Sequence, residues 1–221
     1  MTYDNELELD RLAAQPVVLT VPGLGNSGDG HWQTIWERER DDCHRVEMGS
    51  WDKPHRNTWV NKLNLAIHQA GRPVVLVAHS LGCLAVAWWA EYERPAYGNP
   101  VVGALLVAPP DVDLPDADPR IAPFGICPRN PLPFPAFVAA SQNDPWCSLK
   151  TARGLARDWQ ARFAVAGAIG HINADSGIGG WDFGRLMLDQ LLGVRDGNPV
   201  NRTEPTGRSR AAGTSSAPPS L

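Results

Sequence analysis

One segment, residues 74–92, restricts the fold more than any other part of the chain. Residues 74–78 are uniformly apolar, a turn follows at residues 79–82, and the chain then stays largely apolar to Tyr92. A short apolar run bounded by a turn signal is typical of a buried strand, and a helix that is apolar on nearly all sides must also be buried. The segment therefore predicts a central strand that leads directly into a buried helix.

The rest of the chain repeats this alternation of strand and helix. Several expected strands are apolar on both faces, which is typical of a parallel sheet covered on both sides. Residues 109–135 are rich in proline and have no clear period, so we expect a loop across the top of the sheet and no separate lid. The expected strands span residues 17–21, 45–48, 74–78, 101–108, 136–141 and 163–168, and the expected helices span residues 31–40, 58–70, 81–92, 149–160 and 183–192.

Bulk composition limits the domain organisation. The 221 residues suit one domain with a substantial core, which we place at residues 16–195 after an N-terminal extension of residues 1–15. Residues 196–221 are rich in Gly, Pro, Ser, Thr and Arg, so we expect a disordered C-terminal tail. The four cysteines form no C-x-x-C pair, which indicates reduced thiols, no metal site and a cytoplasmic protein.

Charge and hydropathy exclude two kinds of partner. The net charge of −4 argues against nucleic-acid binding, which needs a basic face. No apolar run approaches the roughly 20 residues that span a bilayer, so no membrane span is expected. The start of the chain also lacks the basic and apolar regions of a secretory signal.

Ser80 lies in the turn between the central strand and its helix. Small residues two positions before and after it, Ala78 and Gly82, would allow a sharp turn that exposes the hydroxyl. The amide groups at the start of the helix would face the same point. Ser80 is therefore a candidate nucleophile, and the alternative is that it only caps the following helix.

Candidate acid and base residues follow later strands. Asp144 comes after the strand expected at 136–141, and His171 comes after the strand expected at 163–168. In parallel sheets, sites form beyond the carboxyl ends of the strands, so these side chains can meet Ser80 there. Asp111 is an alternative acid. His79 is expected to point away from the serine, and His31 lacks the context of a strand end.

The order serine, acid, histidine predicts an α/β-hydrolase fold, compact and without a lid, with a mostly parallel sheet and helices on both faces. Acyl transfer needs backbone amides that face the developing oxyanion, and we expect them from Leu81 and Leu24, with Gly25 as the next choice. The glycine-rich residues 23–30 leave a nucleotide site open as an alternative, since Gly23, Gly25 and Gly28 meet the G-x-G-x-x-G spacing.

Five short motifs of the chain are similar to those of the small α/β-hydrolases of the retinoblastoma-binding protein 9 family. The resemblance covers roughly residues 17–192 and implies a compact serine hydrolase with a triad of Ser80, Asp144 and His171. Residues 81–85 lack the glutamate of the Leu-x-Cys-x-Glu motif, so no pocket-protein binding is expected. The motifs that carry the resemblance are residues 21–23, 31–32, 79–82, 142–146 and 170–173.

The sequence therefore predicts a carboxylesterase-like serine hydrolase for small-molecule acyl substrates, which needs no metal or organic cofactor. An acyltransferase and a non-catalytic binding protein on the same scaffold are the alternatives. Of the nine tryptophans, Trp51, Trp146 and Trp181 lie in expected loops near strand ends, so they are candidates for contact with substrate.

Overall fold

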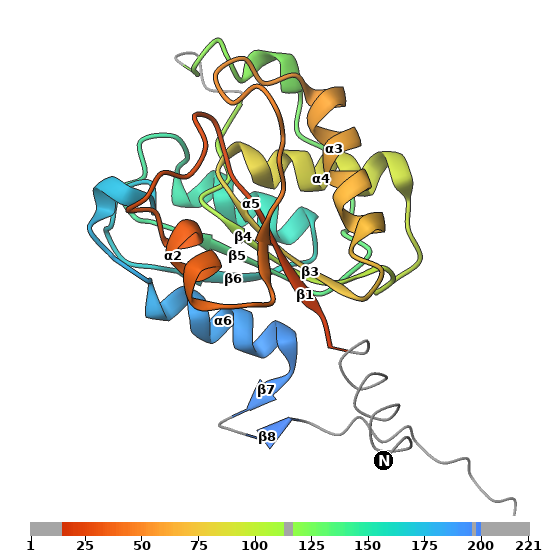
Figure 1. Cartoon of the computed structure of the whole chain (residues 1–221). Coiled ribbons are helices and arrows are strands. Elements are labelled where there is room, and N and C mark those ends of the chain that lie inside the picture. The colour runs from red at the N-terminus through yellow and green to blue at the C-terminus, as the bar shows by residue number, and fades with distance from the viewer. Residues whose placement is uncertain (1–14, 113–116, 196–197, 200–221) are drawn as a thin grey trace, which may run out of the picture.

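The computed structural model describes residues 15–112, 117–195 and 198–199. It contains one six-stranded sheet in the order β2-β1-β3-β4-β5-β6, in which all neighbouring strands are parallel (Figure 1). The strands are β1 (Val17–Val21), β2 (Cys43–Arg45), β3 (Val74–His79), β4 (Val101–Val107), β5 (Ala136–Ala140) and β6 (Arg162–Val165).

Helices cover both faces of this sheet, as the sequence predicts. α3, α4 and α5 lie on one face, whereas α2 and α6 lie on the other. Their bounds are α2 (Trp32–Glu39), α3 (Arg56–Gln69), α4 (Leu81–Glu93), α5 (Leu149–Asp158) and α6 (Asp182–Leu192). A two-stranded antiparallel pair, β7 (Val194–Arg195) and β8 (Asn198–Pro199), follows α6.

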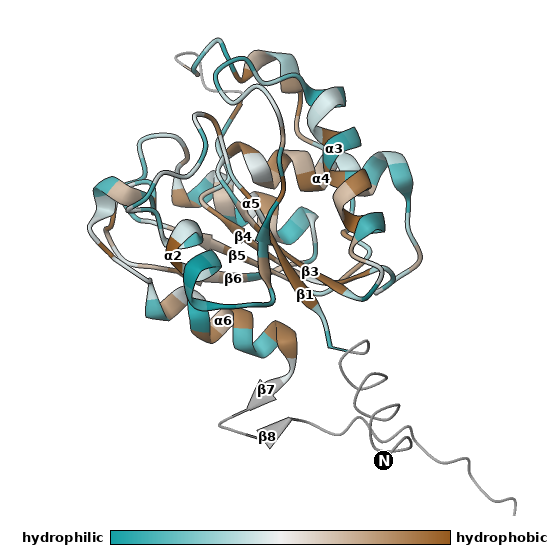
Figure 2. Ribbon diagram, in the orientation of Figure 1, coloured by the Kyte–Doolittle hydropathy of each residue, from teal (hydrophilic) through white to brown (hydrophobic). Residues whose placement is uncertain are grey.

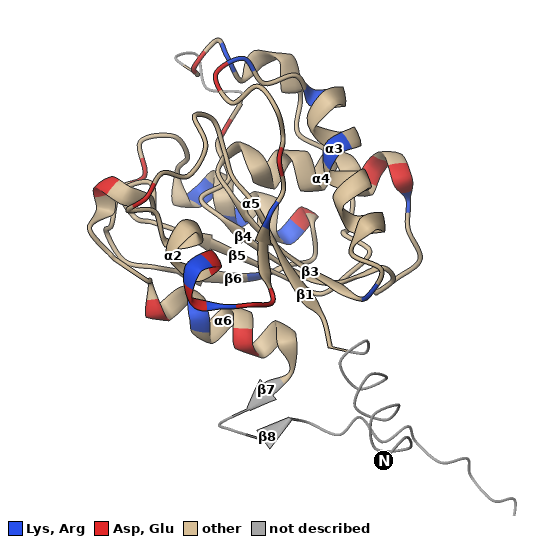
Figure 3. Ribbon diagram, viewed as in Figure 1, with Lys and Arg blue, Asp and Glu red and all other residues tan. Residues whose placement is uncertain are grey.

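The two faces hold separate cores because side chains alternate along each strand. On β3, Leu76 and Ala78 pack in the core beneath α3 and α4, whereas Val75 and Val77 pack beneath α2 and α6. Figure 2 shows the resulting apolar central strands, and Figure 3 shows that the charged residues lie mainly on helices and loops. The strongest strand of the sequence is therefore buried on both faces at the centre of the sheet.

β2 and β6 differ most from their predicted bounds, by more than one residue at an end. β2 spans Cys43–Arg45, and the amide of Val46 still donates to the carbonyl of Thr20 on β1 at 2.9 Å, but the chain then leaves β1 and Gly49 turns it at φ 94°. β6 ends at Val165, and Gly167 adopts φ 88°. The chain thus has a longer loop before His171 than the predicted strand at 163–168 allows.

The segment between β4 and β5 crosses the top of the sheet. In its described part the only helical element is the 3₁₀ turn η1 (Ala122–Phe124), so no α-helical lid is present there. A second 3₁₀ turn, η2 (Ala174–Ser176), follows the His171 loop. Among the residues that the structure describes, no helix is long and apolar enough to cross a membrane.

The predicted N-terminal extension and C-terminal tail lie outside the described residues, apart from residue 15 and residues 198–199.

Candidate active site

Ser80 occupies a strained turn between β3 and α4. Its backbone has φ 52° and ψ −124°, a conformation that costs a non-glycine residue on the order of 1–3 kcal/mol. Its amide donates to the carbonyl of Val107 at 2.8 Å, which ties the turn to β4. Ser80 is at the N-cap position of α4, yet its side chain makes no capping hydrogen bond. The hydroxyl therefore faces away from the helix and is available for other chemistry.

Two glycines let this turn approach its neighbours. A Cβ at Gly23 would lie 2.7 Å from the Cβ of Ser80, so the loop after β1 passes directly beside the serine. A Cβ at Gly82 would lie 2.1 Å from the carbonyl oxygen of Val21. The small residue two positions after the serine is thus required by the close approach of α4 to β1.

The structure brings Ser80, His171 and Asp144 into one hydrogen-bonded row. The Nε2 of His171 is 2.9 Å from the Oγ of Ser80, and its Nδ1 is 2.9 and 3.0 Å from the two carboxylate oxygens of Asp144. Only 2% of the Asp144 side chain and 11% of the His171 side chain are exposed. Because the carboxylate can only accept, Nδ1 carries the proton in this arrangement, and Nε2 is left to accept from the serine hydroxyl.

Hydrogen bonds link the loop that carries Asp144 to the loop that carries His171. The Oδ1 of Asn143 accepts from the amide of Gly170 at 2.7 Å, and the Oγ of Ser141 accepts from the amide of Ile169 at 2.9 Å. Asp144 itself also accepts from the amide of Trp146 at 2.9 Å. These contacts hold Asp144 against His171 even though β6 ends early. Asp111 instead contacts Trp146, whose carbonyl accepts from the Asp111 amide at 2.9 Å.

His79, which is expected from the sequence to point away from Ser80, also lies at the site. Its imidazole lines the same cavity, with its ring centroid 4.9 Å from that of His171. Its Nε2 donates to the backbone carbonyl of His171 at 2.9 Å. Burial lowers the pKa of His79 well below its usual value, so this imidazole is neutral at physiological pH.

The alternation of side chains along β3 could have predicted the side of the sheet on which His79 lies. Val75 and Val77 face α2 and α6, so the next residue of that alternation, His79, faces the same side. Trp32 on α2 lies there too, and its Nε1 donates to the carbonyl of Ile172 at 2.8 Å. Two buried donors therefore fix successive carbonyls of the His171 loop. His31, which sequence reasoning passed over, is the N-cap of α2 and lines the cavity beside His79.

Of the two expected oxyanion donors, Leu24 lines the cavity and Leu81 directly follows Ser80. The amides of Leu24 and Leu81 have no hydrogen-bond acceptor within the described ranges, whereas the amide of Gly25 donates to the carbonyl of Trp51 at 3.1 Å. An acceptor that binds the amides of Leu24 and Leu81 would therefore break no existing hydrogen bond, whereas one that binds the amide of Gly25 would.

Of the three candidate tryptophans, only Trp146 lines the cavity, with its ring centroid 5.9 Å from that of His171. Trp181 is 5% exposed and packs against Trp32 in the core beneath α2 and α6. Trp51 packs edge-on against Trp59, with 5.6 Å between ring centroids. Neither Trp181 nor Trp51 lines the cavity. Both instead fill space between elements, as large aromatic side chains often do.

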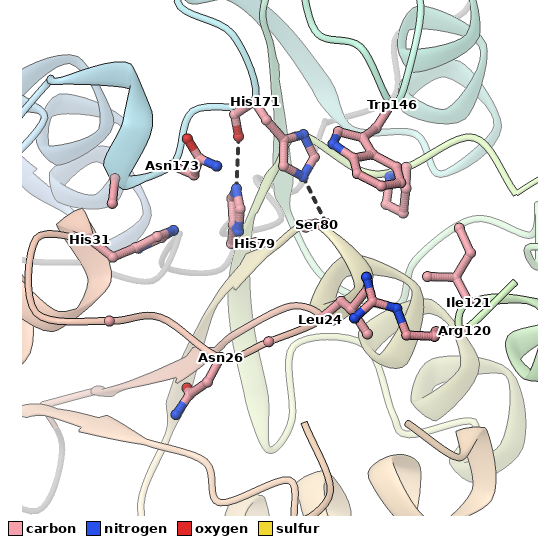
Figure 4. A pocket seen from close by; sticks show the side chains of 14 residues that line it. Leu24, Asn26, His31, His79, Ser80, Arg120, Ile121, Trp146, His171 and Asn173 are labelled. Atoms are coloured by element: carbon pink, nitrogen blue, oxygen red, sulfur yellow. Dashed lines mark hydrogen bonds between the residues drawn. The ribbon is translucent and has the colours of Figure 1, made fainter. Parts of the chain in front are cut away.

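The cavity around Ser80 has a volume of about 310 Å³, and its two sides differ in polarity (Figure 4). Leu24, Ile121 and Trp146 lie on one side of the serine, whereas His31, His79 and Asn173 lie on the other.

Comparison with known proteins identifies the family of this chain. The family model described as serine hydrolase matches residues 18–190. A YdeN-like hydrolase from Pectobacterium atrosepticum is 30% identical, with a TM-score of 0.71 over 86% of this chain and 97% of that chain. No curated protein matches the chain.

Two further solved structures share the fold at lower identity. The ydeN gene product of B. subtilis is 22% identical, with a TM-score of 0.65 over 80% of this chain and 98% of that chain. A monoacylglycerol lipase from Paleococcus ferrophilus is 13% identical, with a TM-score of 0.57 over 81% of this chain and 96% of that chain. These likenesses confirm the predicted α/β-hydrolase fold.

Proposed function

The chain belongs to the serine hydrolase family, and we propose that it cleaves esters or related acyl compounds through an acyl-enzyme formed on Ser80. The observation that carries the proposal is the continuous contact from Ser80 Oγ through the His171 ring to the Asp144 carboxylate. A serine hydroxyl is a weak nucleophile unless a base touches it, and here the base is in turn oriented by an acid.

In the proposed first half-reaction, His171 Nε2 takes the hydroxyl proton as Ser80 Oγ attacks the substrate carbonyl carbon. The resulting oxyanion accepts hydrogen bonds from the amides of Leu24 and Leu81, and one such donor is typically worth about 3–4 kcal/mol of barrier. His171 then returns the proton to the leaving oxygen, whose bond to carbon breaks, and the acyl-enzyme remains.

In the second half-reaction, water replaces the leaving alcohol. His171 takes a proton from the water as its oxygen attacks the acyl carbon, and the bond to Ser80 Oγ breaks as the proton passes to that oxygen. The products are a carboxylic acid and the free enzyme. Asp144 keeps the imidazole in the required tautomer and stabilises its charged form throughout.

The finer resemblance to the retinoblastoma-binding protein 9 family enters here as part of the proposal. It implies a compact serine hydrolase without a lid, with a triad of Ser80, Asp144 and His171. The proposal also includes a small-molecule substrate, one catalytic unit at residues 16–195, a cytoplasmic location and no organic or metal cofactor, which rest on the composition, the cysteines and the chemistry of the triad. Residues 81–85 are buried in α4, which supports the expectation that they bind no pocket protein.

A fluorophosphonate probe tests the proposal directly, since it reacts only with an activated serine. We expect the wild type to be labelled and Ser80→Ala to remain unlabelled, while Ser50→Ala, which changes an exposed serine away from the cavity, is labelled like the wild type. Absence of labelling in the wild type would favour a binding protein on the hydrolase scaffold.

Turnover of short p-nitrophenyl esters then separates hydrolysis from acyl transfer. A hydrolase releases carboxylic acid from the ester when no second alcohol or thiol is added. If product forms only with such an acceptor, the enzyme is an acyltransferase. Thermal protection by ATP or NAD, with no effect of short esters, would instead support the nucleotide site at residues 23–30.

A further inference from the structure

His31 holds a buried hydrogen-bond donor that no group of the described chain accepts. It is the N-cap of α2 and is only 4% exposed. Its Nδ1 accepts from the amide of Gln33 at 3.2 Å, so the proton of the neutral ring resides on Nε2. That Nε2 is buried without a partner although the residue lines the Ser80 cavity. A buried donor without an acceptor is costly, which suggests that its partner comes with a ligand.

The His31 side chain is uncharged at physiological pH. Its pKa is lowered to about 4, mainly by burial and in addition by electrostatic interaction with Arg45 and His171. The imidazole therefore presents one neutral N–H group. A neutral N–H group donates to an oxygen acceptor without adding a charge to the cavity, so hydroxyl, ether and carbonyl oxygens of a neutral ligand are suitable partners.

Asn173 adds a donor to the same side of the cavity. Its Oδ1 accepts from the amide of Asp175 at 3.1 Å. Its amide NH₂ group has no acceptor in the described part of the chain, and the residue lines the cavity. Asn26 also lines the cavity, but its side chain points away from His31 and Ser80 (Figure 4), and its Oδ1 accepts from Arg45 and from the amide of Ser27.

The opposite side of Ser80 is different. Leu24, Ile121 and Trp146 supply apolar surface there, and the one charged residue, Arg120, is paired with Asp118 at 2.5 Å. An ester bound across Ser80 therefore meets apolar groups at one end and hydrogen-bond donors at the other.

We propose that His31 and Asn173 form a subsite for uncharged oxygen atoms in the leaving alcohol of the substrate, and that the apolar side holds the acyl group. This inference rests on the proposed function. His171 must give its proton to the leaving oxygen, so the leaving group lies against that imidazole. His79 packs between His171 and His31, with ring centroid separations of 4.9 and 4.7 Å, so His31 lies on the same side of Ser80 as His79.

Matched esters test the subsite. Butyrate esters of ethylene glycol, diethylene glycol and triethylene glycol are compared with alkyl butyrates of equal chain length, and acid release gives kcat/KM for each. The length series allows for the distance between Ser80 and His31. For the best-fitting length we expect kcat/KM to favour the glycol ester about tenfold, the usual order for a hydrogen bond to an otherwise unpaired donor.

Three variants assign the preference to His31. Asn has an oxygen that can replace Nδ1 as the cap, so His31→Asn keeps the cap and removes the Nε2 donor, and the preference should fall about tenfold. Gln places an amide nitrogen near the Nε2 position, so His31→Gln should keep most of it. His55 is an exposed N-cap histidine on α3, and His55→Asn should leave the preference unchanged.

A binding measurement keeps the inference testable without turnover. In ¹⁵N-labelled Ser80→Ala, the diethylene glycol ester should shift the imidazole Nε2 resonance of His31, whereas the alkyl ester should not. Equal kcat/KM for the two ester series, an unchanged preference in His31→Asn, or no shift of this resonance would each overturn the subsite. Failure of the proposed function is seen separately, as absence of fluorophosphonate labelling of the wild type.

Discussion

Replacement of Gly82 by alanine should destabilise the protein and displace the proposed nucleophile. A Cβ at this position would lie 2.1 Å from the carbonyl oxygen of Val21 and 2.8 Å from that of Pro22. Both atoms belong to the backbone at the end of β1, so no side-chain rotation can relieve the overlap. Real Cβ atoms do not approach oxygen so closely, and the start of α4 must move away from β1.

The expected cost follows from this geometry. Overpacking of a tight interior typically costs roughly 1–3 kcal/mol, and a clash with two backbone oxygens places Gly82→Ala at or above the upper end. For a chain of this length, ~3 kcal/mol corresponds to a fall in Tm of about 6–12 °C. Because Leu81 and Ser80 precede the displaced residue, labelling by a fluorophosphonate should also slow markedly.

Gly154→Ala provides the matched control. Gly154 also lies in a helix, α5, but a Cβ there would meet no atom within 4 Å. Because alanine is the better helix former by about 0.8–1.0 kcal/mol, this variant should gain stability. Urea unfolding measures both variants. If Gly82→Ala unfolds within about 0.5 kcal/mol of the wild type and is labelled at the same rate, the close approach of α4 to β1 is not what positions Ser80.

Three other predictions concern Asp144, the buried histidines and the buried cysteines. Asp144→Asn should lower kcat by a factor on the order of 10⁴, because the amide favours the wrong tautomer of His171, while urea unfolding stays near that of the wild type. Burial lowers the pKa of His31 to about 4 and that of His79 well below 6.5. The unfolded chain therefore binds more protons below pH 6.5, and stability, complete above that pH, should fall toward pH 4 by about 1.4 kcal/mol per pH unit for each histidine. Urea unfolding at pH 7 and pH 5 measures this loss, and His79→Gln should make it smaller. All four cysteines are buried, and burial raises the thiol pKa of Cys43 to about 12, so Ellman's reagent at pH 8 should react only after urea is added, and reaction in the native state would contradict the structure.

The sheet and its helices could be predicted from the sequence because each element has a local signature. The largely apolar runs that become β1 and β3 are buried on both faces. The bounds of β2 and β6 could not be predicted, since they depend on where neighbouring strands stop accepting hydrogen bonds and on glycines with positive φ. The loop after β6 is held by Ser141 and Asn143 of the preceding loop, and that pairing is invisible in either segment alone.

The same distinction explains which site residues could be found. Ser80, Asp144 and His171 each follow a strand, and a parallel sheet places the ends of its strands together, so position along the chain suffices to bring them near one another. Tryptophans carry no such signal, because a tryptophan in a loop looks alike whether it lines a cavity, as Trp146 does, or fills the core, as Trp181 does.

His31 is the most instructive residue that sequence reasoning passed over. Its backbone role as an N-cap is local, but its importance lies in an Nε2 that has no acceptor and in a ring that packs against His79 from another element. Neither property follows from spacing or hydropathy, because both arise only when α2 docks on the sheet. In this fold the reacting groups are therefore set by strand ends, whereas the groups that would select a substrate are set by packing between elements. Sequence alone is thus more informative about the reaction type than about the molecule on which the enzyme acts.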